Sequence, residues 1–153
     1  MSGVANNLPA QLTAFIGRER ELDELRSLIT SSRILTLNGT GGCGKTRLAQ
    51  QLATDVIDHY DGGVWQVELA LVVDPDRVPA ALAQALGEPD LTGALVEAIV
   101  VRLTDRATLI VLDNCEHLLE PVAQLVDTLL RRCPPLTILA TSREPLGVPG
   151  EVG

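Results

Sequence analysis

The sequence predicts an α/β fold in which helices cover a mainly parallel sheet. Along the 153 residues, short apolar runs typical of strands alternate with longer stretches that have helical spacing. The uninterrupted apolar run over 108–113 suits a strand that is buried on both faces of a parallel sheet. A glycine-rich segment separates the first expected strand from the helix after it. Alternating strands and helices of this kind indicate a layered α/β domain.

The same patterns give the order of the elements. In the first half we expect a helix over 18–29, a strand at about 33–38, a helix from the glycine-rich segment to roughly residue 59, a turn at 61–63 and a strand over 64–69. Helices over 76–87 and 92–104 and a strand over 108–113 follow. A strongly amphipathic helix over about 118–130 and a strand over 136–141 complete the order. Pro121 fits that last helix only if it lies in the first turn, where its missing N–H is tolerated. No internal repeat or low-complexity segment interrupts this order.

Composition limits the classes of protein to consider. The length and the 46% hydrophobic content suit one domain with one core, and no apolar run approaches the roughly 18–20 residues that span a membrane. No secretory signal is visible at the N-terminus, and three scattered cysteines favour reduced thiols, so we expect a cytoplasmic location. The net charge of −8 argues against direct nucleic-acid contact by this segment, which would need a basic face.

The most informative motif fits G-x-x-x-x-G-K-[ST] without a mismatch. It reads Gly39-Thr40-Gly41-Gly42-Cys43-Gly44-Lys45-Thr46. Between a strand and a helix, such a loop turns its backbone N–H groups toward phosphate oxygens. Lys45 would reach the β- and γ-phosphates of a nucleoside triphosphate, and the Thr46 hydroxyl would bind Mg²⁺. The alternative is a glycine turn that happens to precede a lysine.

A second candidate is the acid at the end of the run over 108–113. Ligands of open α/β sheets bind beyond the carboxyl ends of the strands, so Asp113 is expected beside the glycine loop. A carboxylate there can hold Mg²⁺ while the metal bridges two phosphates. The alternative is an Asp that caps the next helix.

Four motifs in one order carry a resemblance to a known family. They are Phe15-Ile16-Gly17-Arg18-Glu19, the glycine loop, Leu112-Asp113-Asn114-Cys115-Glu116-His117, and Thr141-Ser142-Arg143-Glu144-Pro145-Leu146-Gly147. The chain resembles, from about Leu8 to its last residue, the STAND class of signal-transduction ATPases in its NB-ARC branch. It is most similar to the predicted ATPases of large bacterial transcriptional regulators of LuxR-like or SARP-like type. The resemblance implies a three-layer P-loop NTPase fold that binds ATP or ADP with Mg²⁺.

The resemblance also implies roles for further residues. Phe15, Ile16, Gly17 and Arg18 match the segment that lies along the adenine, although Phe15 and Ile16 also suit a hydrophobic staple before the first helix. Arg143 matches an arginine that senses the γ-phosphate; the alternative is an exposed surface arginine. The expected nucleotide contacts thus comprise these residues, the glycine loop through Thr46, and Arg47.

Hydrolysis is less strongly indicated than binding. Many relatives carry a second acid directly after the Mg²⁺-binding Asp, whereas this chain has Asn114, a poor proton acceptor. Glu116 or His117 could act as the general base instead, or Glu116 could simply favour the next helix through its dipole. The resulting catalytic candidates are Lys45, Asp113, Glu116 and Arg143, with slow turnover or none.

The cysteines allow two interpretations. Cys43 lies in the phosphate loop beside Lys45 and a helix N-terminus, where a redox-sensitive thiol or a small residue that fits the loop are both possible. Cys115 and Cys133 are expected to pack in the core.

The last residues bear on the extent of the domain. The fold implied by the resemblance orders its sheet 5-1-4-3-2, and the sequence stops about where the fifth strand should begin. We therefore expect residues 1–12 to be a flexible lead and 13–153 to be a nucleotide-binding domain that lacks the fifth strand. This would be the front portion of a longer regulator whose missing subdomains, or another chain, are its partners.

Three functions follow from these observations. The first is a regulatory switch module that exchanges ATP and ADP. The second is an assembly module that recruits a partner strand at an exposed sheet edge. The third, a small-molecule kinase, would need an arginine-rich lid and an acceptor site, neither of which is identifiable in the sequence.

Overall fold

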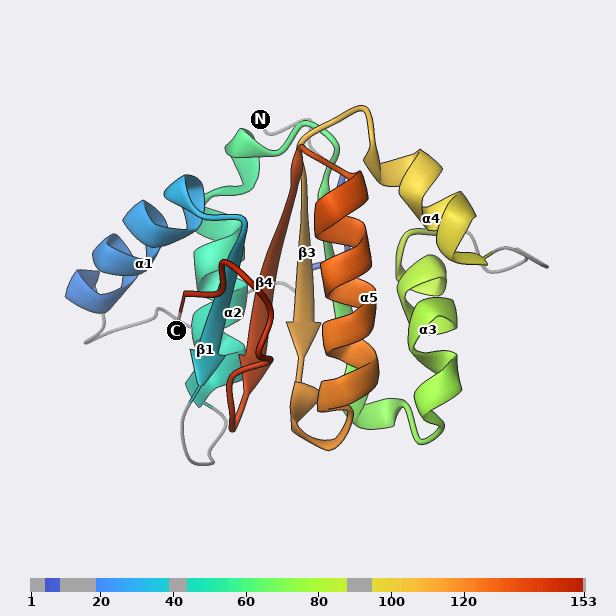
Figure 1. The fold of residues 1–153 in the computed structure, drawn as a ribbon. Helices are drawn as coiled ribbons and strands as arrows, with labels where there is room; N and C mark the ends of the chain where they lie inside the picture. Colours follow the sequence, from blue (N-terminus) through green and yellow to red (C-terminus); the bar gives the residue numbers. More distant parts are fainter. Residues whose placement is uncertain (1–4, 9–18, 39–43, 88–94, 153) are drawn as a thin grey trace.

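A parallel β-sheet between two layers of helices forms the body of the molecule in the computed structural model (Figure 1). The structure describes residues 5–8, 19–38, 44–87 and 95–152. The strands are β1 (Ile34–Asn38), β2 (Val64–Glu68), β3 (Thr108–Asp113) and β4 (Leu136–Ser142), and the helices are α1 (Glu19–Ser31), α2 (Gly44–Asp55), α3 (Val78–Ala85), α4 (Leu95–Leu103) and α5 (Leu119–Arg132). The α/β class and the order of elements predicted from periodicity are confirmed.

The strand order is β1-β4-β3-β2, and all three pairings are parallel. The expected order 4-3-2 beside strand one is therefore confirmed. On the other side of β1, Val152 makes a single parallel bridge with Leu35, through a bond from Thr36 N–H to Val152 O at 2.8 Å. In the described part of the chain, Val152 is therefore paired with β1 at the position where a fifth strand would lie.

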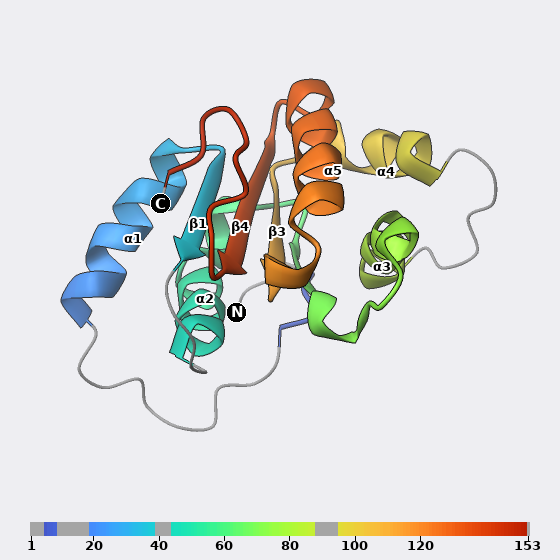
Figure 2. The same ribbon diagram turned by 60° about the horizontal axis from the view of Figure 1, so that its bottom comes forward.

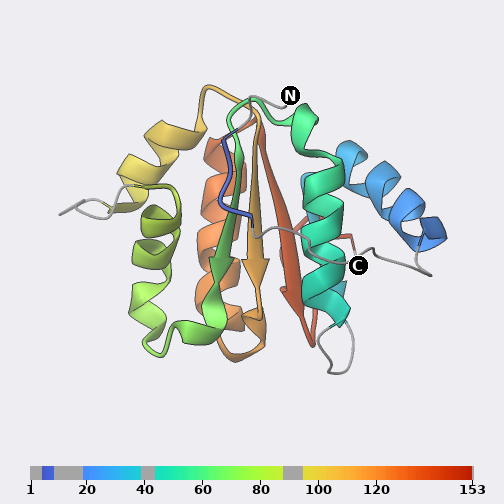
Figure 3. The same cartoon turned by 180° about the vertical axis from the view of Figure 1, so that it is seen from behind.

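Two apolar clusters hold the layers together. On one face α3, α4 and α5 pack against Ile110, Leu112 and Ile138. On the other, α1 and α2 pack against Leu109, Val111 and Leu139 (Figures 1 and 3). Alternate residues of β3 thus enter opposite clusters, as the continuous apolar run predicted.

Some element boundaries differ from the predictions. The helix after the glycine loop ends at Asp55 rather than near residue 59, because Val56 leaves helical geometry and a short 3₁₀ turn, Ile57–His59, follows. The helix expected over 76–87 begins as a 3₁₀ turn, Pro75–Arg77, in which the Asp74 carboxylate accepts from Asp76 N–H. Pro121 is the third residue of α5, in the first turn as predicted.

The N-terminal residues 5–8 lie along the outer edge of β2 (Figure 3). Asn6 bridges Val64 in parallel, and Val64 N–H donates to Ala5 O at 3.0 Å. Gly63 permits this approach: its φ is +106°, and a Cβ there would lie 2.8 Å from Ala5 O. This segment covers part of an edge that would otherwise be open. Among the described residues, no helix is both long and apolar enough to cross a membrane.

Candidate phosphate and metal site

The carboxyl ends of the strands meet the N-terminus of α2 at one edge of the sheet (Figure 2). Asn38, Ser142, Asp113 and Glu68 are the last residues of their four strands. Helix α2 begins at Gly44, so Lys45 and Thr46 of its first turn lie at this edge. Because open parallel sheets bind ligands at such an edge, we call this the crevice.

The Asp113 side chain forms hydrogen bonds with three residues of the crevice. It is 4% exposed, and its carboxylate accepts from the Thr46 hydroxyl at 3.0 and 3.1 Å and from the Thr141 hydroxyl at 2.6 Å. The Asn114 amide donates to the same carboxylate at 3.3 Å. These partners are neutral, so none of them compensates the charge of a buried carboxylate, and a cation bound there would do so.

The donor atoms fit a magnesium ion. A carboxylate and a hydroxyl, both oxygen donors, face each other where the resemblance placed the metal, and Mg²⁺ prefers oxygen ligands. The capping alternative for Asp113 finds no support, because the N-cap residues of the following 3₁₀ turn and of α5 are Asn114 and Leu118, neither with a side-chain cap.

Lys45 spans the crevice from α2 to β4. Its ammonium donates to the carbonyl of Ser142 at 3.1 Å, directly before Arg143. The structure therefore brings the end of β4 next to Lys45. Arg143, the residue after Ser142, is exposed. Arg47 is exposed on the first turn of α2.

Several sequence-predicted residues fall outside the described part of the chain. They are Phe15, Ile16, Gly17, Arg18, Gly39, Thr40, Gly41, Gly42 and Cys43. Their roles as adenine and phosphate contacts stay predictions, as does the redox alternative for Cys43.

The segment after Asp113 bends sharply. Asn114 adopts φ 62° and ψ 58°, the left-handed region, and its N–H donates to the Thr141 hydroxyl at 2.8 Å. Asn tolerates this conformation better than most residues with a side chain, and it bonds locally there. Glu116 and His117 lie on the 3₁₀ turn that follows, and a His117 ring nitrogen lies 3.1 Å from Val72 O.

Cys115 and Cys133 are both buried at 0% exposure, which confirms the packing role predicted for them. Burial, with additional effects from the nearby Glu116 and Asp113 carboxylates, raises the pKa of the Cys115 thiol far above its usual range. Its thiol donates to Leu112 O at 3.4 Å. Cys115 is therefore an unreactive thiol that packs in the core below the crevice.

Sequence reasoning missed Thr141, a polar residue of the site, and Glu151, which lies on the segment after β4. Thr141 bonds both Asp113 and Asn114, and Glu151 accepts from Thr36, Leu146 N–H and Gly147 N–H. Thr141 belonged to a quoted motif, and its place at the end of a strand beside that of Asp113 was a usable signal. Glu151 had none, because its partner Thr36 is 115 residues away.

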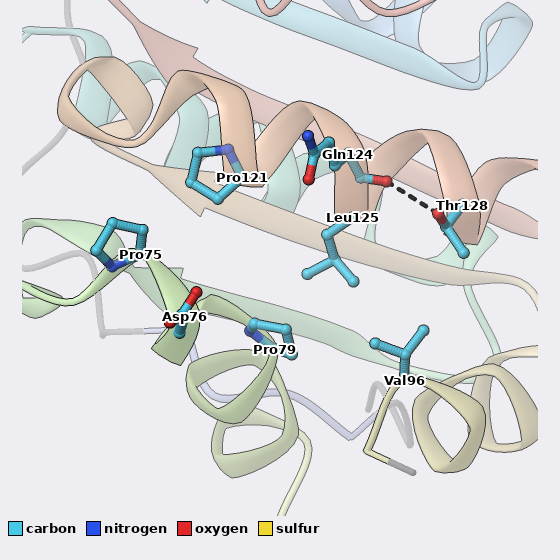
Figure 4. A pocket seen from close by; sticks show the side chains of 8 residues that line it. All are labelled: Pro75, Asp76, Pro79, Val96, Pro121, Gln124, Leu125 and Thr128. Carbon is cyan, nitrogen blue, oxygen red and sulfur yellow. Dashed lines mark hydrogen bonds between the residues drawn. The ribbon is translucent and has the colours of Figure 1, made fainter.

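A separate hollow of about 280 Å³ lies among α3, α4 and α5 (Figure 4). Pro79, Val96 and Leu125 are among its lining residues. These helices cover the face of the sheet opposite α2, whereas Asp113 points toward Thr46 of α2. The hollow is therefore not part of the crevice.

Comparison with known proteins decides the family. Residues 27–146 match the AAA domain family. The chain belongs to this family of P-loop ATPase domains. The match covers the crevice elements from the end of α1 to the segment after β4.

Relatives are found among mycobacterial proteins. An uncharacterized protein of Mycobacterium tuberculosis is 41% identical over 150 residues, which cover 97% of this chain and 38% of the relative. A protein of the same species described as an HTH-type transcriptional regulator is 46% identical over 129 residues, which cover 84% of this chain and 14% of the relative. The chain thus spans well under half the length of these relatives.

Solved structures show the same fold at low sequence identity. Cdc6p from Pyrobaculum aerophilum superposes with a TM-score of 0.63 at 18% identity, covering 90% of this chain and 41% of that one. A STAND protein with a tetratricopeptide repeat sensor from Pyrococcus horikoshii gives 0.61 at 18% identity, covering 99% and 24%. These structures share the fold of this chain, and the HTH-type regulator among the relatives agrees with the resemblance to ATPases of regulators. The NB-ARC branch stays a prediction.

Proposed function

We propose that this domain binds ATP and ADP with Mg²⁺ at the crevice and serves as the nucleotide-dependent switch of a regulator. The observation that carries the proposal is the pairing of Thr46 with a buried Asp113 carboxylate. The matching AAA family and the HTH-type regulator among the relatives support the class of function. Slow hydrolysis, or none, belongs to this proposal.

The residues have distinct parts in this function. Thr46 and Asp113 would hold Mg²⁺, which supplies positive charge to the phosphates when bound. Lys45 would exchange its bond with Ser142 O for phosphate oxygens. That exchange would release the end of β4 beside Arg143, so nucleotide occupancy would be transmitted to the segment after the sheet.

The two alternatives receive less support. A strand-recruiting assembly module would use the outer edge of β1, where Val152 already makes a bridge with Leu35. Nothing in the described part of the chain favours a kinase. The roles of Phe15–Arg18 at the adenine and of Arg143 as sensor remain parts of our proposal, as does a cytoplasmic location.

Calorimetry with Mg²⁺-ATP and Mg²⁺-ADP tests the proposal. Lys45→Ala removes the charged donor and should weaken ATP binding by about 2–4 kcal/mol. Arg20→Ala, on the exposed first turn of α1, is the matched loss of a cation and should leave the affinity within about twofold. Equal affinities in the unmutated chain and in Lys45→Ala would contradict the proposal.

A further inference from the structure

A carboxylate on the strand next to Asp113 has a position that the motifs did not reveal. Glu68 is the last residue of β2 and is the register partner of Asp113 in the parallel pairing of β2 with β3. Neighbouring strands are about 4.8 Å apart, and register partners of parallel strands project to the same face of a sheet. Glu68 therefore stands beside Asp113 at the mouth of the crevice.

The face to which Glu68 belongs follows from contacts of its neighbours. Gln66, two residues earlier on β2, accepts at its Oε1 from Gln50 of α2 at 3.2 Å. Asp113 likewise meets Thr46 of α2. Because side chains alternate along a strand, Glu68 shares the α2 face with both, and it is exposed there.

The end of β2 is held in place on both sides. Gln66 N–H donates to Asn7 Oδ1 at 2.6 Å, and the Asn7 amide donates to Gln66 O at 2.9 Å. Gln66 is 7% exposed, so its bond to Gln50 is sheltered from water. The backbone that carries Glu68 is thus fixed from the sheet edge and from α2, as a group that must be positioned requires.

Two residues that follow Asp113, Asn114 and His117, are less suited to activate water. Asn114 is not a base, and its amide faces the Asp113 carboxylate. The left-handed turn at Asn114 takes the chain away from the strand direction, and the His117 ring meets Val72 O. Glu68 instead continues the row of strand ends on the side of Asp113 away from β4.

We propose that Glu68 is the general base for ATP hydrolysis, an inference that rests on the proposed nucleotide site. Its carboxylate accepts a proton from a water molecule whose oxygen attacks the γ-phosphorus. The bond between the γ-phosphorus and the β–γ bridging oxygen breaks, and the electron pair leaves with ADP. The products are ADP and inorganic phosphate, and Glu68 returns the proton to phosphate or solvent.

The test compares Glu68→Gln with Glu120→Gln, which changes an exposed acid on the first turn of α5, in single-turnover hydrolysis and in binding of Mg²⁺-ATP. Glu68→Gln should lower the hydrolysis rate by about 10²- to 10⁴-fold while the Kd for a non-hydrolysable ATP analogue stays within about twofold. Glu120→Gln should keep the rate within about threefold. After incubation with ATP and gel filtration, Glu68→Gln should retain ATP where the unmutated chain retains ADP.

Chemical rescue distinguishes a general base from a residue that only supports the structure. Glu68→Ala supplied with formate should regain part of the lost rate, because a small carboxylate can enter the vacated space and accept the proton. Normal hydrolysis by Glu68→Gln, or a chain that binds ATP but never hydrolyses it, would overturn the role of Glu68 and leave the binding site standing. A chain that binds no ATP would contradict the proposed function itself.

Discussion

Thr141, near the end of β4, is the residue that joins β4 to the end of β3 in the crevice. Its hydroxyl donates to Asp113 and accepts from Asn114 N–H, and the residue is 1% exposed. One hydroxyl therefore fixes both the buried carboxylate and the left-handed turn after it. At the level of single residues, the site therefore depends on these two bonds of Thr141 as well as on Lys45, Thr46 and Asp113.

Thr141→Val keeps the shape of the side chain and removes both bonds. Because the Asp113 carboxylate and Asn114 N–H then lose a buried partner, we expect the free energy of unfolding to fall by about 1–3 kcal/mol. Urea denaturation measures the change. Thr54→Val, which removes an exposed hydroxyl that donates to Gln50 O, is the matched control and should change it by under about 0.5 kcal/mol. Equal effects of the two variants would contradict this account.

Cys115 gives a prediction about pH. Burial raises the pKa of its thiol above the usual value of 9.0, so the unfolded chain loses this proton at a lower pH than the folded chain. Above pH 9 the unfolded state then binds fewer protons, and the free energy of unfolding should fall by up to about 1.4 kcal/mol per pH unit for this group.

Urea denaturation between pH 7 and 10 checks the slope. In Cys115→Ala the contribution of this thiol disappears, so the stability should fall less steeply above pH 9 than in the unmutated chain. The same slope in both proteins would show that this thiol does not stay protonated in the fold.

Among the elements, the segment after β4 is tied back to the sheet by one carboxylate. Glu151 accepts from Leu146 N–H at 2.8 Å, from Gly147 N–H at 2.9 Å and from the Thr36 hydroxyl in β1, whose residue is fully buried. These bonds fold residues 146–152 over the outer side of β1 and set where Val152 pairs. The segment that starts at Arg143 is therefore anchored at its far end.

Glu151→Ala should release this segment. We expect faster hydrogen exchange at Leu146 and Gly147 N–H, and a loss of about 1–3 kcal/mol in stability because Thr36 keeps a buried hydroxyl without its partner. Exchange followed by NMR gives residue resolution. Glu144→Ala, an exposed acid of the same segment, is the control and should leave these amides unchanged.

The elements were predictable because their signals are local, and parts of the site were not. The run over 108–113 placed β3 and Asp113, and the strand-end rule placed Asp113 beside Thr46. By contrast, only the register of β2 and β3 places Glu68 beside Asp113, and the bond of Glu151 with Thr36 spans 115 residues. Both arrangements depend on tertiary pairing, which leaves no spacing pattern in the sequence.

At the scale of the whole molecule, the sheet brings together residues from distant parts of the chain at one edge. Lys45 and Thr46 come from α2, Asp113 from β3, and Ser142 and Arg143 from β4 and its end. The opposite face carries α3, α4 and α5 and has its own hollow. We expect nucleotide phosphates to bind at the α2 side of this edge, next to Lys45, the only lysine of the chain.

That single lysine permits the most direct measurement. Protein labelled with ¹³C and ¹⁵N at lysine gives one set of lysine signals, those of Lys45, which can be followed by NMR during titration with Mg²⁺-ATP. We expect the ε-methylene signal to move and to saturate with the Kd found by calorimetry. ATP binding that saturates by calorimetry while this signal stays in place would contradict phosphate binding at Lys45.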